Sequence, residues 1–347
     1  ITNNNEIIFA DYNGQVRIIK DGMELENENF PYDTGNQVWG AVSSADLDLD
    51  GNIDFVVVSK SKSIYVFDIN GLKSEYDADR YLIGTPVIGN FDSDEELEIA
   101  IGGYSGTSST NPLFVINHDG TDVVGFPYVV GEKIKAGAAV SDMDGNGIDD
   151  IIFGTDSDNL HVILDSGVSA PNFPVSLSDR IQSEPAILDI DGEKIILTGC
   201  KDNNFYAINY TDGSLRFLIP TEDDVFTSPS FNGEYIYFGS DDGNVYAVDY
   251  NGNLVDGYPL VLGEGEAVIG SIVFSDLNGD GSASKIIGTS GGNIYVFNDN
   301  NELLQYFPVE YQYPIASSPL VVDLDFDGDM DILSGTNGDL IVVDVKH

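Results

Sequence analysis

The chain has 347 residues, of which 42% are hydrophobic, and it contains 38 glycines. This composition excludes a disordered chain and supplies enough apolar side chains for a large core. Asp and Glu number 59 against 14 Lys and Arg, which gives a formal net charge of −45. A surface this acidic repels phosphates and anionic membranes and attracts cations, so we expect neither nucleic acid binding nor membrane insertion.

Covalent cross-links do not account for the stability of this chain. Cys200 is its single cysteine, so no intrachain disulfide can form, and its place after the apolar segment 195–197 predicts a small buried hydrophobe. No apolar run approaches the roughly 18 residues of a membrane span. Ile1 is not an initiator residue and no signal peptide is visible, so we expect a processed or excised segment. Bound metal is then the expected source of extra stability.

One short apolar motif recurs eight times along the chain. Its copies start 48, 49, 47, 45, 40, 49 and 46 residues apart, and a period near 46 is typical of four-stranded propeller blades. The copies are 16–19, 64–67, 113–116, 160–163, 205–208, 245–248, 294–297 and 340–343. We therefore interpret the motif as the third strand of a repeated blade.

The other strands of each unit follow a fixed order around this motif. A short first strand such as 318–322 leads into an acidic loop, a second strand such as 331–333 and a Gly-rich turn such as 239–244. An Asp-Gly or Asn-Gly turn then leads to a fourth strand, which must be an edge because it carries proline. The aromatic-proline pairs are Phe30-Pro31, Phe126-Pro127, Phe173-Pro174, Tyr258-Pro259 and Phe307-Pro308.

These patterns predict an all-β fold, a single β-propeller of four-stranded blades over residues 1–347. No segment has a helical period, and a two-layer sandwich would not explain the fixed repeat. The repeats are approximately 1–38, 39–82, 83–135, 136–182, 183–225, 226–267, 268–315 and 316–347. Eight third-strand motifs favour eight blades with the first and last incomplete. The alternative is seven blades, in which 28–32 serves as the outer strand of the last blade.

The acidic loop at 46–54 places oxygen ligands at alternate positions. Asp46, Asp48, Asp50 and Asp54 occupy positions 1, 3, 5 and 9, and Asn52 at position 7 offers its backbone carbonyl. Clustered carboxylates repel one another, and calcium accepts six or more oxygen ligands in irregular geometry. The loop is not an EF-hand, because no bidentate Glu or flanking helix accompanies it. We predict a calcium ion at this loop.

Variants of the loop occur at the same position in four other repeats, so we expect three to five calcium ions. The loop at 276–284 has serine in place of the last carboxylate, and the loop at 90–98 has Glu95 in place of the turn glycine. The expected ligands in these loops are Asp142, Asp144, Asn146, Ile148 and Asp150; Asp323, Asp325, Asp327, Asp329 and Asp331; Asp276, Asn278, Asp280, Ser282 and Ser284; and Asn90, Asp92, Asp94 and Glu98.

Asp, Asn and Gly also form ordinary turns without metal. Two repeats distinguish these interpretations, because 189–193 is truncated and 230–234 has lost its acidic set, while both keep their strands. The blade can therefore form without the loop, and the loop is an added feature.

The loops, the Gly-Thr turns and the blade period together resemble the FG-GAP/VCBS repeat family. The Gly-Thr turns are Gly154-Thr155, Gly288-Thr289 and Gly335-Thr336. The resemblance covers nearly the whole chain, although the repeats at 183–267 are more similar to quinoprotein-type blades. It implies an extracellular or cell-surface calcium-binding propeller, used for adhesion, recognition or scaffolding with a protein or glycan ligand on one face.

No catalytic constellation is visible, so we expect a binding protein. His118 and His161 are expected as surface or packed side chains, and no nucleophile elbow, zinc motif or P-loop occurs. One tryptophan, Trp39, and few basic residues argue against a quinone cofactor. The alternative is a propeller that binds or degrades polysaccharide. Its basic candidates, Lys60/Lys62 and Lys133/Lys135, are expected on a solvated strand face or turn, and the tyrosines at 65, 206, 246 and 295 are expected in the core.

Overall fold

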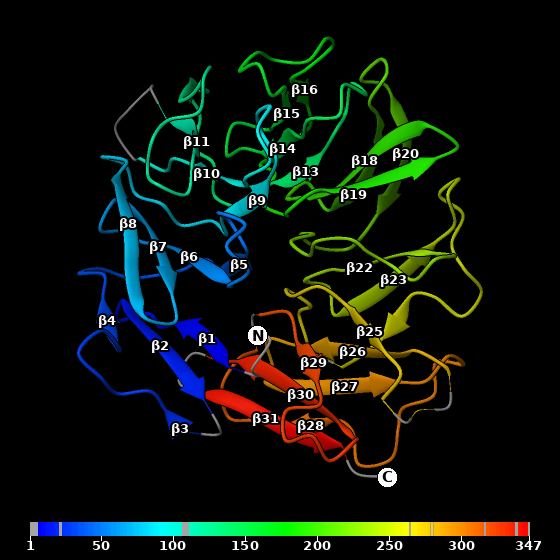
Figure 1. Ribbon diagram of the computed structural model, residues 1–347. Helices are drawn as coiled ribbons and strands as arrows, with labels where there is room; N and C mark the ends of the chain where they lie inside the picture. Colours follow the sequence, from blue (N-terminus) through cyan, green and yellow to red (C-terminus); the bar gives the residue numbers. More distant parts are fainter. Residues whose placement is uncertain are drawn as a thin grey trace. The chain divides into compact units, whose positions relative to one another are not determined.

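The computed structural model describes residues 6–20, 23–105, 111–263, 265–277, 279, 281–315, 317–336 and 339–345. These residues form eight antiparallel sheets and no helix (Figure 1). The sheets are the blades of a β-propeller, which confirms the predicted fold class and the count of eight blades. Contacts divide the chain into two compact units, 1–194 with 210–213 and 195–209 with 214–347.

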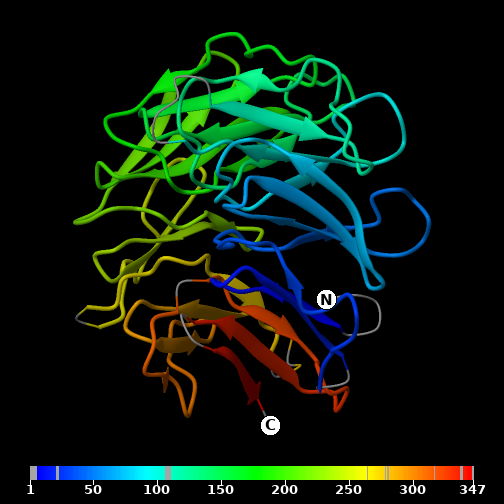
Figure 2. The same cartoon turned by 90° about the vertical axis from the view of Figure 1, so that its left-hand side faces the viewer.

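Four sheets belong to the first unit and follow one another along the chain, coloured blue to green in Figure 2. Their strands are β1 (Ile7–Ala10), β2 (Gln15–Lys20), β3 (Met23–Glu24) and β4 (Tyr32–Asp33); β5 (Ser43–Ala45), β6 (Asp54–Val58), β7 (Ser63–Asp68) and β8 (Gly71–Asp77); β9 (Val87–Gly89), β10 (Glu98–Gly102), β11 (Pro112–Ile116) and β12 (Tyr128–Val129); and β13 (Ala139–Ser141), β14 (Asp150–Gly154), β15 (Asn159–Ile163) and β16 (Val175–Ser176).

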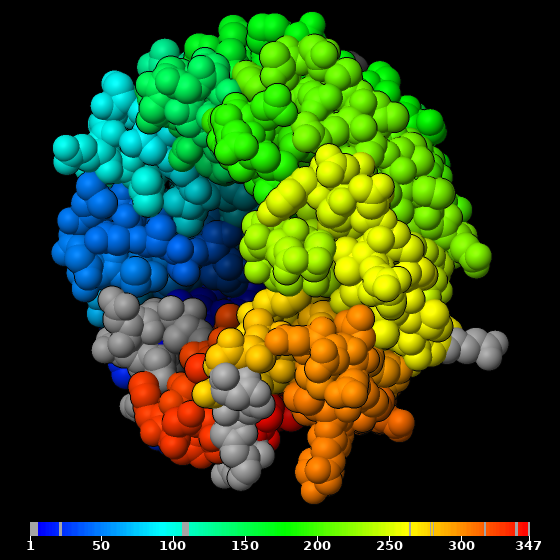
Figure 3. Space-filling model, turned by 90° about the vertical axis from the view of Figure 1, so that its right-hand side faces the viewer, coloured from blue at the N-terminus to red at the C-terminus, as the bar shows by residue number. Residues whose placement is uncertain are grey.

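Three sheets belong to the second unit, and Figure 3 shows this part of the chain from green through yellow and orange to red. Their strands are β21 (Ser230–Phe231), β22 (Ile236–Gly239), β23 (Asn244–Val248) and β24 (Leu260–Val261); β25 (Val273–Ser275), β26 (Ser284–Gly288), β27 (Asn293–Phe297) and β28 (Val309–Glu310); and β29 (Leu320–Val322), β30 (Met330–Gly335) and β31 (Leu340–Val345). The division assigns residues of the fifth sheet to both units. That sheet comprises β17 (Ala186–Ile190), β18 (Glu193–Cys200), β19 (Asn204–Asn209) and β20 (Leu215–Pro220).

The seven-blade alternative is wrong. It needed 28–32 to complete the last blade, but Tyr32 pairs with Val16 inside the first sheet. The last sheet has three strands among the described residues, β29 to β31.

The second strand is deeply buried in several blades. All five residues of β6, β10, β14 and β26 are buried, because both faces of these strands are covered by neighbouring sheets. In the first unit, Val56 and Val66 of one blade pack in one cluster with Ile99 and Phe114 of the next.

Several core predictions are confirmed. Tyr65, Tyr206 and Tyr246 are 4%, 7% and 6% exposed, and Cys200 is fully buried. Tyr295 is partly buried and packs against the core. The strands that follow the aromatic-proline pairs are short and lie at sheet ends, as β12 and β16 do. The fourth strand of the second blade differs, because β8 has seven residues and no proline. Its length brings a lysine to the acidic loop of that blade.

Candidate metal centres

The five acidic loops all lie between the first and second strands of their blades. The loop 46–54 joins β5 to β6, and 142–150 joins β13 to β14. The remaining loops are 90–98 between β9 and β10, 276–284 between β25 and β26, and 323–331 between β29 and β30. The last loop residue is also the first or second residue of the second strand, so a buried strand holds its side chain in place.

A shared set of hydrogen bonds shapes these loops. The first carboxylate accepts a bond from the glycine nitrogen at position 6, as Asp46 does from Gly51 at 3.0 Å. The last carboxylate accepts a bond from the nitrogen at position 2, as Asp150 does from Met143 at 2.8 Å. The equivalent pairs are Gly147–Asp142, Gly281–Asp276 and Gly328–Asp323 for the first bond, and Leu47–Asp54, Phe91–Glu98 and Leu324–Asp331 for the second.

The residue at position 2 is buried in four of the five loops and partly buried in the last, and sequence reasoning missed its role as an anchor to the core. Leu47, Phe91 and Met143 are 0%, 1% and 3% exposed, although polar residues flank each of them. An apolar residue at position 2 of every loop was the signal that could have revealed the anchor. Burial of this residue fixes the loop backbone, and the alternate carboxylates then lie on the opposite side.

The backbone of the loop also turns through left-handed conformations. Gly51 has φ of 89°, a region that favours glycine, and Leu49 at position 4 has φ of 56°. Phe326 occupies position 4 of the last loop with φ of 62° and is 74% exposed. Bulky apolar residues rarely adopt this conformation, so both loops hold local strain.

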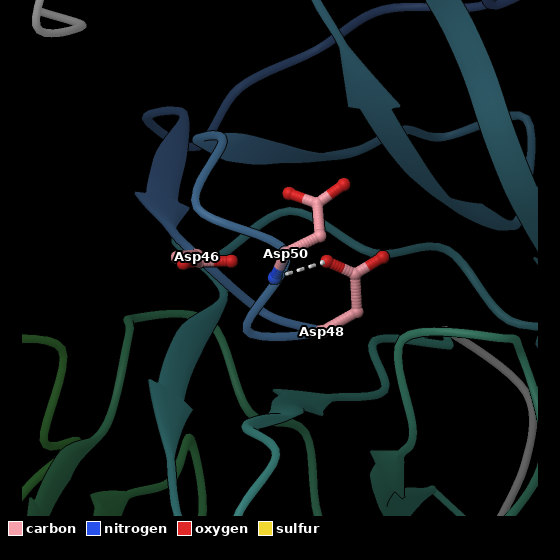
Figure 4. A group of neighbouring side chains, drawn as sticks. All are labelled: Asp46, Asp48 and Asp50. Carbon is pink, nitrogen blue, oxygen red and sulfur yellow. Dashed lines mark hydrogen bonds between the residues drawn. The ribbon is translucent and has the colours of Figure 1, made fainter.

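The structure brings the predicted ligand oxygens together in four loops. In each of these loops, three carboxylates offer oxygen atoms that all lie within 4.8 Å of one another. The groups are Asp46, Asp48 and Asp50; Asp92, Asp94 and Glu98; Asp142, Asp144 and Asp150; and Asp323, Asp325 and Asp327. Figure 4 shows the first group, with the bond from the Asp50 nitrogen to Asp48 at 3.3 Å.

Other predicted ligands lie outside these groups. Asn52 donates its side-chain amide to Asp50, and Asn146 donates its own to Asp165. Asp54 and Asp331 bond to the nitrogen at position 2 of their loops. Ile148, Asp329 and Ser282 occupy position 7, where the ligand would be the backbone carbonyl. In the fifth loop, Asn278 and Asp280 lie outside the described residues, while Asp276 and Ser284 flank them.

Two buried oxygen atoms indicate that these loops fit a cation. The Oδ1 atoms of Asp46 and Asn90 are buried and accept no hydrogen bond from the described residues. Both belong to position 1, and an unpaired buried oxygen is costly unless a donor or a cation faces it. Oxygen-only ligand sets of this kind suit calcium, which tolerates irregular geometry better than magnesium does.

Burial raises the pKa of the last carboxyl group in the loops. Glu98 is 1% exposed, and burial followed by repulsion from Asp92 and Asp94 raises its pKa to about 7. Burial likewise raises the pKa of Asp150 to about 6, although backbone bonds from Asp165 and Met143 oppose the shift. Without a cation, these groups therefore retain protons more strongly than ordinary carboxyls.

Lys73 on β8 lies between two carboxylates of the first loop. Its Nζ atom is 2.8 Å from Asp48 and 2.8 Å from Asp54. The hydrogen bond from Lys73 lowers the pKa of Asp48, and the two carboxylates raise the pKa of Lys73 although burial opposes this. This ammonium neutralises part of the loop and competes with a metal ion for the same oxygens.

We expect Lys73→Met to strengthen calcium binding at 46–54 by about tenfold, because a competing charge a few ångströms away contributes roughly 1 to 2 kcal/mol. Calorimetric titration of calcium into the variant and into the parent chain measures the two affinities. Arg216→Met is the matched control, because Arg216 occupies the same bulge position on β20, in a blade whose loop is truncated. Equal affinities in the Lys73 variant and the parent would show that Lys73 does not compete.

The two divergent repeats form ordinary turns. Asp189 accepts a bond from Gly192 at 2.9 Å, and Asn232 accepts bonds from Glu234 and Tyr235. All of these residues are described, and neither turn contains a carboxylate group of the kind found in the four loops. The expectation that these blades form without the acidic loop is confirmed.

Of the two described histidines, His161 is packed away from the acidic loops and His118 contacts one of them. His161 is 6% exposed, stacks on Phe153 at 5.2 Å and contacts Glu132 at 3.3 Å, as expected for a packed histidine. His118 lies 3.2 Å from Glu96, beside the loop 90–98.

Comparison with known proteins shows the fold and leaves the family open. Neither a family model nor a curated protein sequence matches the chain. Among solved structures, the computationally designed Ika8 protein has a TM-score of 0.70 at 16% identity, over 98% of this chain and 93% of its own. BBS1N in complex with ARL6DN has a TM-score of 0.60 at 14% identity, over 88% of this chain and 90% of its own.

BamB from Moraxella catarrhalis is a third similar structure, with a TM-score of 0.54 at 15% identity over 88% of this chain and 97% of its own. At these identities the likeness extends to the propeller fold alone. Within the described part of the chain, no helix is long and apolar enough to cross a membrane.

Proposed function

We propose that this chain is an extracellular calcium-binding propeller of FG-GAP/VCBS type, serving as an adhesion, recognition or scaffolding module of a larger exported protein. The observation that carries the proposal is the repeated convergence of three carboxylates within 4.8 Å in four blades. The buried, unpaired Oδ1 atom of Asp46 supports a cation at that point. A net charge of −45 makes divalent ions more favourable still, because each ion reduces self-repulsion.

Calcium would be held by the carboxylates of positions 1, 3, 5 and 9, with a backbone carbonyl at position 7. When bound, it neutralises these groups and ties the first strand of a blade to the second. Asp142, Asp144 and Asp150 would supply such ligands from both sides of one loop. The proposed role of the ion is rigidity, since two blades keep their strands without an acidic loop.

The binding role draws support from the fold. BBS1N, one of the similar structures, was crystallised in complex with ARL6DN. A face formed by turns and connecting loops is therefore our proposed binding surface.

A second candidate function is a propeller that binds or degrades polysaccharide. The 47% exposure of Trp39, which stacks on Tyr12, favours this candidate.

Metal analysis tests the calcium part of the proposal. After dialysis against calcium and removal of free ions, we expect three to five calcium ions per chain by elemental analysis. Asp142→Asn combined with Asp144→Asn should remove one ion, because it discharges two of three converging carboxylates. Asp189→Asn, in the truncated loop, is the matched control and should remove none. A calcium-free protein, or equal uptake of magnesium at the same concentration, would contradict the proposal.

A ligand screen separates the two binding roles. Protein and glycan arrays probed with the calcium-loaded chain should give binding without product formation if the chain is a recognition module. Depolymerisation of a bound polysaccharide would instead support the second candidate.

A further inference from the structure

A row of aromatic and lysine side chains lies at the strand ends opposite the acidic loops of the first unit. The strand β6 begins at Asp54 in the loop and ends at Val58, just before Lys60, and β10 likewise ends just before Tyr104. Five residues of strand separate the two ends by roughly 13 to 17 Å. We name this feature the aromatic–lysine row, and it consists of Tyr12, Trp39, Lys60, Tyr81, Tyr104 and Lys133.

Each member of the row contacts the next. Tyr12 and Trp39 stack with ring centroids 6.0 Å apart, and the Nζ atom of Lys60 lies 4.7 Å from the Trp39 ring and 5.8 Å from the Tyr81 ring. Tyr81 pairs with Tyr104 through their backbones. The Nζ atom of Lys133 lies 5.4 Å from the Tyr104 ring. The row is continuous over loops and turns of successive blades.

Three rings of the row are exposed, its other members are partly buried, and hydrogen bonds orient part of it. Tyr12, Trp39 and Tyr81 are 59%, 47% and 43% exposed. The Gln37 side-chain oxygen accepts bonds from the Trp39 indole at 3.2 Å and from the Lys60 ammonium at 2.9 Å. These bonds orient the ring and the cation before any ligand arrives, which lowers the entropic cost of binding.

The charges of the row favour an anionic ligand. Lysines are scarce in this chain, with 14 Lys and Arg against 59 Asp and Glu. None of the ion pairs among the described residues includes Lys60, Lys133 or the nearby Lys135. No carboxylate of the described residues lies within 4.0 Å of Lys60 or Lys133, so both ammonium groups can pair locally with a ligand carboxylate, although the acidic surface elsewhere repels anions.

Exposed, preoriented rings suit the apolar faces of sugar rings, and a continuous row suits a linear polymer. We propose that the aromatic–lysine row binds a polysaccharide that carries uronic acid carboxylates, with sugar rings stacked on Trp39 and the tyrosines and carboxylates paired with Lys60 and Lys133. This inference rests on the proposed binding role, but its residues are separate from the calcium loops.

The test is a binding titration of the calcium-loaded chain against a panel of oligosaccharides. The panel contains three uronate oligomers, of glucuronate with N-acetylglucosamine, of galacturonate and of mannuronate, together with neutral glucose oligomers and a poly-glutamate peptide. We expect binding to at least one uronate oligomer, with neutral oligomers at least tenfold weaker. Trp39→Ala should weaken this binding at least tenfold, and Lys60→Met or Lys133→Met at least fivefold.

Two variants serve as matched controls outside the row. Tyr306→Ala removes an 85% exposed ring of the second unit, and Lys20→Met removes a lysine that is paired with Glu6. Both should bind as the parent chain does. Loss of binding in these controls, no binding to any uronate oligomer, or preference for the poly-glutamate peptide would overturn the inference. Uronate binding that persists after calcium is removed would uphold the row even if the calcium proposal fails.

Discussion

Removal of calcium is expected to lower the midpoint of thermal unfolding of this chain by about 10 °C. At a hundredfold excess over its Kd, a ligand bound only to the folded state contributes about 2.7 kcal/mol per site, so three sites contribute about 8 kcal/mol. For 347 residues the entropy of unfolding is roughly 0.7 kcal/mol/K, which converts that free energy into the stated shift. Differential scanning calorimetry with calcium and with chelator measures it.

The matched variant for this experiment replaces the first carboxylate of three loops, as Asp46→Asn, Asp142→Asn and Asp323→Asn together. Asparagine keeps an oxygen for the glycine nitrogen at position 6, so the loop shape is retained while charge is lost. We expect this variant to unfold near the midpoint of the chelated parent and to respond little to calcium. If calcium leaves the melting of the parent unchanged, the stabilising role is wrong.

Much of the architecture was predictable, because the repeat has a physical cause. The third strand of each blade contributes to the core, so an apolar segment recurs once per blade, and 64–67 is an example in which all four residues are buried. The blade count followed from these segments, and the pairing of Tyr32 with Val16 confirmed it. The ligand groups were also predictable, because alternate positions of a short loop are close in space whatever surrounds them.

Contacts between distant parts of the chain were not predictable. Lys73 reaches Asp48 and Asp54 only because β8 is long and carries a bulge, and nothing in the loop itself indicates a lysine partner. Asp149 bonds to the nitrogen of Asn90 at 3.1 Å and so links the loops of two neighbouring blades.

The same limit applies to the aromatic–lysine row. Lys60 and Lys133 were expected on a solvated strand face or turn; Lys60 lies in a turn, and both side chains are partly buried. The ring of Trp39, at 4.7 Å from Lys60, comes from the connection between two blades. A property of single residues, such as charge, is visible in the sequence, whereas a surface assembled from several blades depends on their packing.

The metal-free chain is expected to become less stable as the pH rises from 5 to 7.5, contrary to most proteins. The folded pKa of Glu98 is about 7 and that of Asp150 about 6, against ordinary values of 4.5 and 3.8. Between the ordinary and the folded pKa, the folded chain binds more protons than the unfolded chain, so the free energy of unfolding falls with rising pH. The loss is on the order of 3 kcal/mol, or about 4 °C in melting temperature.

Calcium should reverse this dependence. A cation beside these groups favours their deprotonated form, so its binding strengthens as the pH rises through 6 to 7. The melting temperature, measured from pH 5 to 8, should therefore fall with rising pH in the presence of chelator and rise with pH in the presence of calcium. Glu98→Gln with Asp150→Asn should reduce the pH dependence of the melting temperature measured with chelator, and should weaken the response to calcium.

Asp241→Asn separates simple burial from metal binding. Burial raises the pKa of Asp241 to about 6, yet this residue lies in the turn between β22 and β23, away from any acidic loop. Its substitution should reduce the pH dependence of the melting temperature measured with chelator, and it should not change the stabilisation by calcium. If this variant abolished the reversal while the Glu98 and Asp150 variants kept it, the loop carboxylates would not be the groups that couple protons to calcium.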